Sequence, residues 1–301
     1  MTVFPAGTIR SCPICFNTSL ARSIYCQVCA YFVLHQREGR ARVACLKRAR
    51  RPDGFRCEYC GALLNLTDTN DPFYPNFDHR TPGILNDLNV CGAIINVSKA
   101  NLTWLEFPIV VHATVDWWDN KVPFRKDIVP FVAWNATSVI KATNRRLVDM
   151  AMQPRVLDAG VRLTFGPGKL CWICERYPVL GAGKYCARCL RLVKRTTGAS
   201  RLEQAAALKM AYSWEHDTFI CHHLGVPLDI FDWTSPFYLW YDHLVPRKNG
   251  TLVVSSALAN RMKTDTDLEE WHAYFRMLDV AMRGGTFERE KLEFKYWMRT
   301  G

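Results

Sequence analysis

The chain contains one short polar pattern twice, at a constant spacing. Around Asp78 the sequence reads FYPNFDHRTP, and around Asp242 it reads FYLWYDHLVP. Downstream of these come IINVSK in the first copy and ALANRMK in the second. Each polar residue of the second copy lies 164 positions after its counterpart, so no gap separates the two patterns. Self-similarity at a fixed offset indicates a tandem repeat, and the chain is therefore expected to fold as two related halves.

The two copies retain the same four polar side chains, although the residues around them differ. In chain order these are an aspartate, a histidine, an asparagine and a lysine: Asp78, His79, Asn96 and Lys99 in the first copy, and Asp242, His243, Asn260 and Lys263 in the second. A hydrophobic core alone would not require these residue types. Their joint retention indicates a shared task.

Eight of the 13 cysteines form two blocks of paired CxxC motifs, CPIC…YCQVC and CWIC…YCARC. Four thiolates at this spacing can occupy the corners of one tetrahedral zinc ion, which leaves no open position for water and makes the zinc structural. The alternative is two disulfides per block, which is typical of exported proteins. The segment MTVFPAGTIRSC lacks the apolar run of a signal peptide, so we expect a protein that is not secreted and lies in a reducing compartment, the cytoplasm or else the nucleoid or nucleus. The predicted zinc ligands are Cys12, Cys15, Cys26, Cys29, Cys171, Cys174, Cys186 and Cys189.

The net charge of +11 favours a polyanionic partner, with nucleic acid before membrane. No run approaches the roughly 18 apolar residues of a membrane span. A basic stretch with helical spacing of its apolar residues follows each cysteine block, beginning HQREGRAR in the first half and LRLVKRTT in the second. Each stretch is either a solvated helix face or a phosphate-contacting surface.

The polar pattern is embedded in a strand–strand–helix arrangement, which predicts a mixed α+β fold. A β-like segment ends at His79, and Pro82 follows. The next apolar run leads into a helix-compatible stretch, on which Asn96 and Lys99 share one face because they are three residues apart. In the second copy Ser255 or Ser256 can cap the corresponding helix.

These residues and their order resemble the HNH, or His-Me finger, endonucleases, which have a ββα-metal core. The resemblance covers about fifty residues in each half. It implies that Asp78 with Asn96, and Asp242 with Asn260, hold a catalytic divalent metal such as magnesium. It also implies that His79 and His243 are the general bases that activate water. Lys99 and Lys263 occupy the position of the family's last, variable histidine and would contact phosphate or support the scaffold.

The chemistry is consistent with this assignment. Phosphodiesters resist hydrolysis because their negative oxygens repel hydroxide and the leaving alkoxide is basic. A hard cation on oxygen ligands neutralises the developing charge. A neutral histidine can take the proton of water near neutral pH.

The resemblance predicts a fold of two tandem repeats, each with a small four-cysteine zinc knuckle and a ββα-metal core with flanking helices. The aromatic residues of the two tails also correspond, Phe124 with Phe287 and FVAW with FKYW, and we interpret them as core residues. The expected boundaries are a first knuckle with its basic helix at 1–50, an HNH-like module at 51–135, a helical connector at 136–160, a second knuckle with its helix at 161–212, and a second module at 213–301.

Many HNH proteins carry a further zinc on two CxxC pairs beside the active site, and this chain departs from that pattern. Cys57 and Cys60 form one pair, but Cys91 stands alone where the second pair would be. In the second half Leu224 replaces the counterpart of Cys60. A metal at Cys57 and Cys60 is therefore doubtful. The neighbouring His222 and His223, by contrast, are expected to be structural.

Two functions compete at this point. The first is a metal-dependent DNA endonuclease with two HNH-like sites, acting on both strands of duplex or branched DNA as an intrachain pseudo-dimer. The second is a zinc-stabilised nucleic-acid-binding or scaffold protein without turnover. RNA stays open as a substrate because no RNA-binding motif is present or required.

Overall fold

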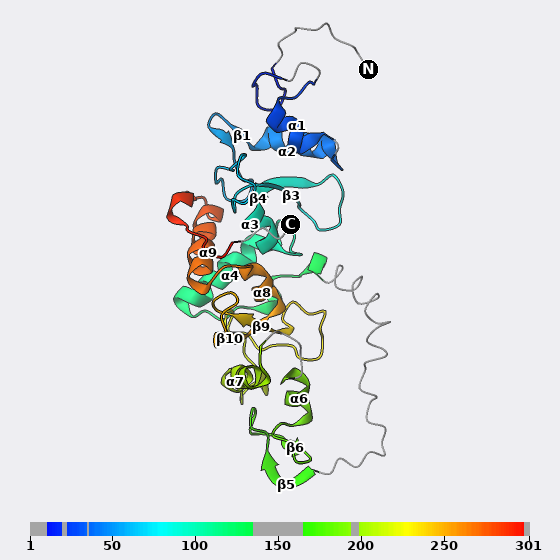
Figure 1. Cartoon of the computed structure of the whole chain (residues 1–301), viewed down its shortest axis with the longest axis vertical. Coiled ribbons are helices and arrows are strands. Elements are labelled where there is room, and N and C mark those ends of the chain that lie inside the picture. The colour runs from blue at the N-terminus through cyan, green and yellow to red at the C-terminus, as the bar shows by residue number, and fades with distance from the viewer. Residues whose placement is uncertain (1–10, 20–22, 35, 135–164, 194–198, 298–301) are drawn as a thin grey trace. The chain divides into compact units, whose positions relative to one another are not determined.

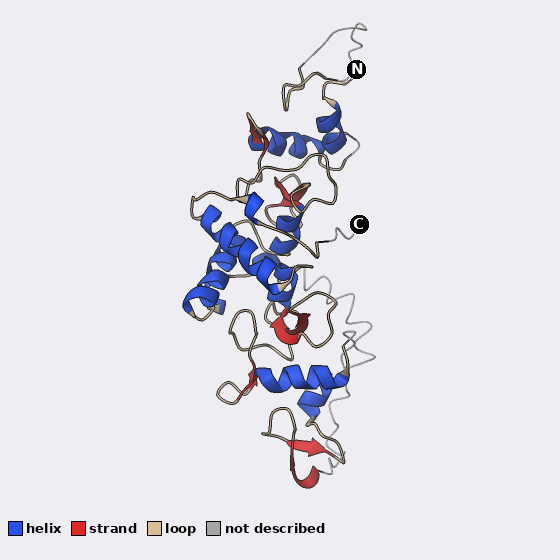
Figure 2. Ribbon diagram, turned by 60° about the vertical axis from the view of Figure 1, so that its left-hand side comes forward, coloured by secondary structure: helices blue, strands red, loops and turns tan. Residues whose placement is uncertain are grey.

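The computed structural model describes residues 11–19, 23–34, 36–134, 165–193 and 199–297 of the 301-residue chain. It is a mixed α+β structure in which short helices alternate with small two-stranded sheets (Figures 1 and 2). The helical connector expected at 136–160 lies outside the described residues.

The described elements follow nearly the same order in both repeats (Figure 1). The first repeat contains α1 (Gln27–Val33), α2 (Gly39–Ala49), β1 (Arg50–Arg51), β2 (Gly54–Phe55), β3 (Pro75–His79), β4 (Leu88–Gly92), α3 (Ala93–Lys99), α4 (Glu106–Asn120) and the 3-10 helix η1 (Lys126–Ile128). The second contains β5 (Phe165–Leu170), β6 (Pro178–Leu180), α6 (Ala187–Val193), α7 (Arg201–Ala211), β7 (Tyr212–Ser213), β8 (Thr218–Phe219), β9 (Leu239–His243), β10 (Leu252–Ser256), α8 (Ala257–Lys263), α9 (Leu268–Met282) and η2 (Arg289–Lys291). None of these helices has the length and apolar character needed to cross a membrane.

The centre of each repeat is an antiparallel hairpin that runs directly into a helix. Strand β3 pairs with β4, and β9 pairs with β10; helices α3 and α8 begin at the next residue. His79 lies opposite Leu88 and His243 lies opposite Leu252, so both histidines occupy the same place in the hairpin. The Ser256 side chain caps α8 by accepting from the Ala259 N–H. The expected strand–strand–helix order is therefore present in both halves.

The loops between the paired strands also correspond. Asn86 and Gly250 have positive φ values of 62° and 79°, and Gly83 and Arg247 have 86° and 60°. Only a few residue types adopt this left-handed backbone readily, so its recurrence at equivalent positions is specific. The two loops share one conformation although their sequences differ.

The compact units of the fold do not coincide with the sequence repeats. One unit contains residues Met1–Pro108 and His272–Gly301, and the other contains Ile109–Trp271. Each unit thus joins the hairpin and helix of one repeat to the C-terminal tail of the other repeat.

Aromatic contacts within each unit show how the exchanged tail is held. In the first unit the ring of Phe73 packs against Phe287 from the second repeat's tail, with centroids 5.5 Å apart, and Arg289 lies 4.9 Å from the Phe73 centroid. In the second unit Phe237 packs against Phe124 at 5.8 Å, and Lys126 lies 4.7 Å from its centroid. Phe237 is the repeat counterpart of Phe73, so each tail packs against the equivalent phenylalanine of the other repeat.

Further contacts anchor the first repeat's tail in the second unit. The indole of Trp117 packs so closely on Gly225 that a Cβ there would lie 2.3 Å from the ring. Trp118 donates its indole N–H to the His223 carbonyl at 2.9 Å, and Trp134 donates to the Thr234 carbonyl at 3.0 Å. The expected core role is confirmed for Phe124, Phe131, Trp134 and Phe287, which are buried, but in the unit that contains the other repeat's hairpin. Phe294 and Trp297 are only half-buried.

Phe287→Ala is therefore expected to destabilise the unit that contains the first repeat's hairpin. Deleting a buried phenylalanine side chain costs about 3 kcal/mol. Hydrogen exchange should show faster exchange in β3, β4 and α3, although the substituted residue belongs to the second repeat. Phe124→Ala is the matched variant and should loosen β9, β10 and α8 instead. If hydrogen exchange became faster only in the repeat that carries the substitution, the packing of each tail against the other repeat's hairpin would be contradicted.

Candidate functional site

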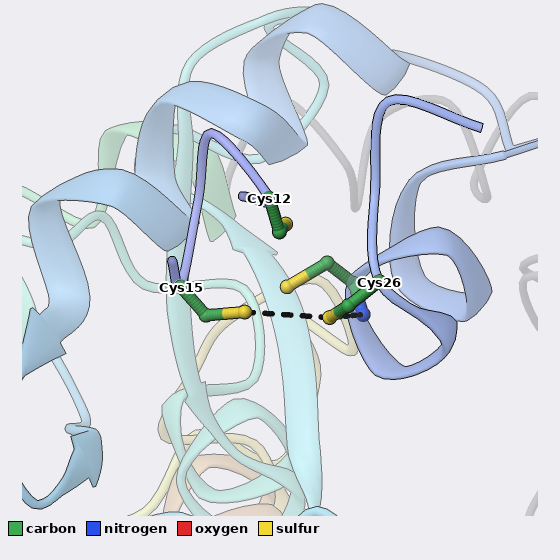
Figure 3. Close-up of side chains that lie close together, drawn as sticks. Cys12, Cys15 and Cys26 are labelled. Carbon is green, nitrogen blue, oxygen red and sulfur yellow. Dashed lines mark hydrogen bonds between the residues drawn. The ribbon is translucent and has the colours of Figure 1, made fainter. Parts of the chain in front are cut away.

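Each four-cysteine block forms a buried cluster. The sulfur atoms of Cys12, Cys15, Cys26 and Cys29 all lie within 4.8 Å of one another, and so do those of Cys171, Cys174, Cys186 and Cys189. In Figure 3 the first cluster's Cys12 and Cys15 come from a turn, and Cys26 faces them from the start of α1. The Cys15 and Cys26 sulfurs are 3.3 Å apart. Two buried groups with this geometry can hold two structural metal ions.

The protonation of the first cluster shows what a metal would supply. The pKa of Cys12 is lowered to about 7: burial opposes the shift, but hydrogen bonds from backbone N–H groups, including that of Cys15, outweigh it. The pKa of Cys29 is raised, first by burial and then by the neighbouring thiols. Four buried thiolates would repel one another, so only a cation among them allows all four to ionise. The donor set of four sulfurs fits zinc.

The carboxylate of Asp78 is buried and bound by two side chains. Its Oδ2 accepts a hydrogen bond from the Tyr59 hydroxyl, and its Oδ1 lies 3.3 Å from the ammonium of Lys99, which is itself fully buried. Lys99 also donates to the Leu102 carbonyl at 2.5 Å. Burial raises the pKa of Asp78, while Lys99 and Tyr59 act in the opposite direction.

The second half repeats this arrangement with one exchange of residue type. Asp242 Oδ2 lies 2.8 Å from Nε2 of the buried His223, and its Oδ1 lies 3.5 Å from the Lys263 ammonium. Lys263 donates to the His243 carbonyl at 2.8 Å. His223 is the repeat counterpart of Tyr59, 164 positions later.

Sequence reasoning missed the contact of Tyr59 and His223 with the aspartates, having interpreted His223 only as structural. The signal was available, because the two residues hold the same position in the repeat and both carry a polar atom at the end of a ring. Residues of different type at equivalent positions can perform one role, here a hydrogen bond to a buried carboxylate.

Asn260 also lies against the second aspartate. Its amide is satisfied when the nitrogen donates to Asp242 Oδ1 and the oxygen accepts from the Trp240 indole, both at 3.2 Å. The structure thus brings together Asp242, Asn260 and Lys263 of the predicted site. In the first half Asp78 and Lys99 are in contact, and Asn96 lies half-buried on α3, one turn before Lys99.

The donor types at these aspartates fit a hard divalent cation, because carboxylate and amide oxygens are its preferred protein ligands. In the second half the two donors are adjacent. In the state described, however, a lysine ammonium neutralises each carboxylate. Holding a cation there requires Lys263 to move away from Asp242, since like charges so close would repel. It also requires the Asn260 amide to turn its oxygen toward the carboxylate.

The two predicted bases are half-buried at the ends of β3 and β9, and their partners differ. Nε2 of His79 lies 3.1 Å from the Glu38 carboxylate, whereas Nδ1 of His243 lies 3.1 Å from the Lys248 carbonyl. Successive residues of a strand point to opposite faces, so each histidine side chain leaves the strand on the face opposite its neighbouring aspartate.

The remaining cysteines are buried, and among the described residues the two four-cysteine groups are the only clusters of three or more potential ligands with metal-site geometry. Cys57 and Cys60, the doubtful pair, belong to neither group. The Cys45 thiol donates to the Arg42 carbonyl at 3.2 Å, and burial raises its pKa to about 12. Cys221 accepts from the Ser256 N–H at 3.3 Å. These contacts are those of structural residues.

Comparison of the chain with protein-family models, curated proteins and solved structures finds no match in any of the three. Its function must therefore be inferred from its own residues and contacts.

Proposed function

We propose that this protein is a metal-dependent nuclease that hydrolyses phosphodiester bonds, with one HNH-like site in each half of the chain. One observation carries the proposal. In both halves a hairpin followed by a helix brings a retained aspartate against a retained lysine, and places a retained histidine at the same strand end. In the second half the retained asparagine joins them.

In this proposal Asp78 with Asn96, and Asp242 with Asn260, hold a divalent cation such as magnesium. When bound, such a cation neutralises charge on the scissile phosphate and stabilises the leaving oxygen. His79 and His243 take a proton from the attacking water. For the lysines the contacts favour the scaffold role over direct phosphate contact, because both ammonium groups are buried.

The two four-cysteine groups hold zinc in this proposal and position the basic helices that follow them. Exposed cationic side chains on and beside α2, including Arg37, Arg40, Lys47 and Arg51, suit contact with a phosphate backbone. DNA, duplex or branched, is the proposed substrate. Cleavage of RNA of the same sequence should be measured beside it.

A second candidate, a nucleic-acid-binding or scaffold protein without turnover, is favoured by a different observation. Both aspartates are buried and already compensated by lysine, which is the arrangement of a structural ion pair. In that case the two halves keep the ββα arrangement only as a frame.

Nicking of supercoiled plasmid with magnesium tests the proposal. The wild-type protein should nick, and His79→Ala combined with His243→Ala should lower the rate about 100-fold or more, the usual contribution of a general base. DNA binding, measured in parallel by fluorescence anisotropy, should be unchanged. Unchanged nicking by the double variant would show that the bases are misassigned. Binding without cleavage in magnesium, manganese or nickel would establish the second candidate.

A further inference from the structure

The two histidines hold their protons on different ring nitrogens. The partner of His79 Nε2 is a carboxylate, which can only accept a hydrogen bond when ionised. The partner of His243 Nδ1 is a backbone carbonyl, which also only accepts. Each contacted nitrogen must therefore carry the proton. In the neutral state the free lone pair is on Nδ1 of His79 and on Nε2 of His243.

Glu38 is held firmly enough to impose this choice. It is the N-terminal cap residue of α2, and its second carboxylate oxygen accepts from the Asn86 N–H in the β3–β4 loop. The pKa of Glu38 is lowered, first by that N–H and also by His79 and Arg42, so the carboxylate is ionised at neutral pH. One side chain thus connects the basic helix, the hairpin loop and the histidine.

The second half has the loop contact but a different histidine partner. Glu203, in the first turn of α7, accepts from the Gly250 N–H at 2.6 Å, and Gly250 is the repeat counterpart of Asn86. In both halves, therefore, a glutamate carboxylate accepts a hydrogen bond from a backbone N–H of the loop between the paired strands. The histidine partners differ: His79 contacts the Glu38 carboxylate, whereas His243 contacts the neutral Lys248 carbonyl.

We propose that Glu38 is a positioning residue for His79 and makes the two halves unequal. It fixes Nδ1 as the atom that accepts the proton, and its negative charge stabilises the imidazolium that forms. A carbonyl orients His243 but supplies no such charge, so the first half carries the larger share of cleavage. This proposal rests on the proposed nuclease function.

The tautomer of each histidine can be measured whether or not the protein cleaves DNA. The measurement is a long-range 1H–15N correlation spectrum of the full chain labelled at histidine. His79→Gln and His243→Gln assign the two rings. Above the imidazole titration range we expect His79 protonated on Nε2 and His243 on Nδ1. Glu38→Gln should make the His79 Nε2 proton exchange faster, and the matched variant Glu203→Gln should leave both rings unchanged. The same tautomer at both histidines, or no effect of Glu38→Gln, would overturn the proposal.

Cleavage kinetics separate a positioning role of Glu38 from a general effect of Glu38 on stability. In a His243→Ala background, where only the first half acts, Glu38→Gln should lower kcat about 10- to 100-fold with little change in KM, the usual cost of losing an orienting partner. In a His79→Ala background the same substitution should have no effect. Equal losses in both backgrounds would overturn the positioning role. Absence of wild-type cleavage would sink the nuclease function, while the tautomer spectra would still decide whether Glu38 fixes His79.

Discussion

Removal of bound metal is expected to unfold the four-cysteine modules while both hairpins stay folded. The purified chain should contain two zinc ions, and a strong chelator should expose the amides of α1 and α6 to exchange. The effect is large, because structural zinc contributes about 10 kcal/mol or more to the folding of small cysteine-ligated modules. Four buried thiols without a cation would leave only a small apolar core to hold each module.

Single substitutions separate the two metals. Cys12→Ser should remove one zinc and loosen α1, and Cys171→Ser should remove the other and loosen α6. Cys45→Ala is the control, because its thiol is buried but belongs to neither cluster; it should leave the zinc content at two. Metal content unaffected by both ligand substitutions would show that the clusters do not bind metal.

Lys99→Met is expected to lower the free energy of unfolding of its unit by about 3–5 kcal/mol, because it leaves the buried carboxylate of Asp78 without its cation. Adding Asp78→Asn should recover part of this loss, since the uncompensated charge is then removed. Urea denaturation monitored by hydrogen exchange at β3 and α3 measures both effects. Unchanged stability of Lys99→Met would show that the ion pair does not support the fold.

The same variant separates the two roles predicted for this lysine. If Lys99 supports the scaffold, stability falls and the residual folded protein keeps its affinity for DNA. If it contacts phosphate, affinity falls while stability does not. Lys263→Met is the matched variant in the second half. It should also lower the stability of its unit, because it removes the cation beside the buried Asp242 carboxylate.

The sequence predicts the local parts of this fold well, because their signals are local. The CxxC spacing is enough to place the sulfurs of Cys12 and Cys26 in one cluster, and the retained residues are enough to place a hairpin and a helix around Asp78 and Asp242. A one-residue slip would turn the buried aspartates outward and separate them from Lys99 and Lys263, so these buried ion pairs depend on the register of each hairpin.

What the sequence does not reveal are contacts between distant residues. Phe124 and Phe287 are recognisable as counterparts, but two related cores offer them almost the same aromatic partner. Local pattern therefore cannot decide which core each tail joins. The contact between Glu38 and His79 spans 41 residues and depends on how α2 meets the hairpin loop. The burial of Lys99 cannot be predicted from the sequence either, because a lysine at the end of a helix is usually solvated.

The most direct test is a crystal structure of the full chain soaked in manganese, with anomalous scattering recorded for manganese and for zinc. The zinc signal at the two cysteine clusters serves as an internal control. We predict a manganese peak between the Asp242 carboxylate and the Asn260 amide oxygen, with the Lys263 ammonium displaced from Asp242, and a corresponding peak at Asp78 and Asn96. Lysines still paired with both aspartates, and no manganese at either, would contradict the account.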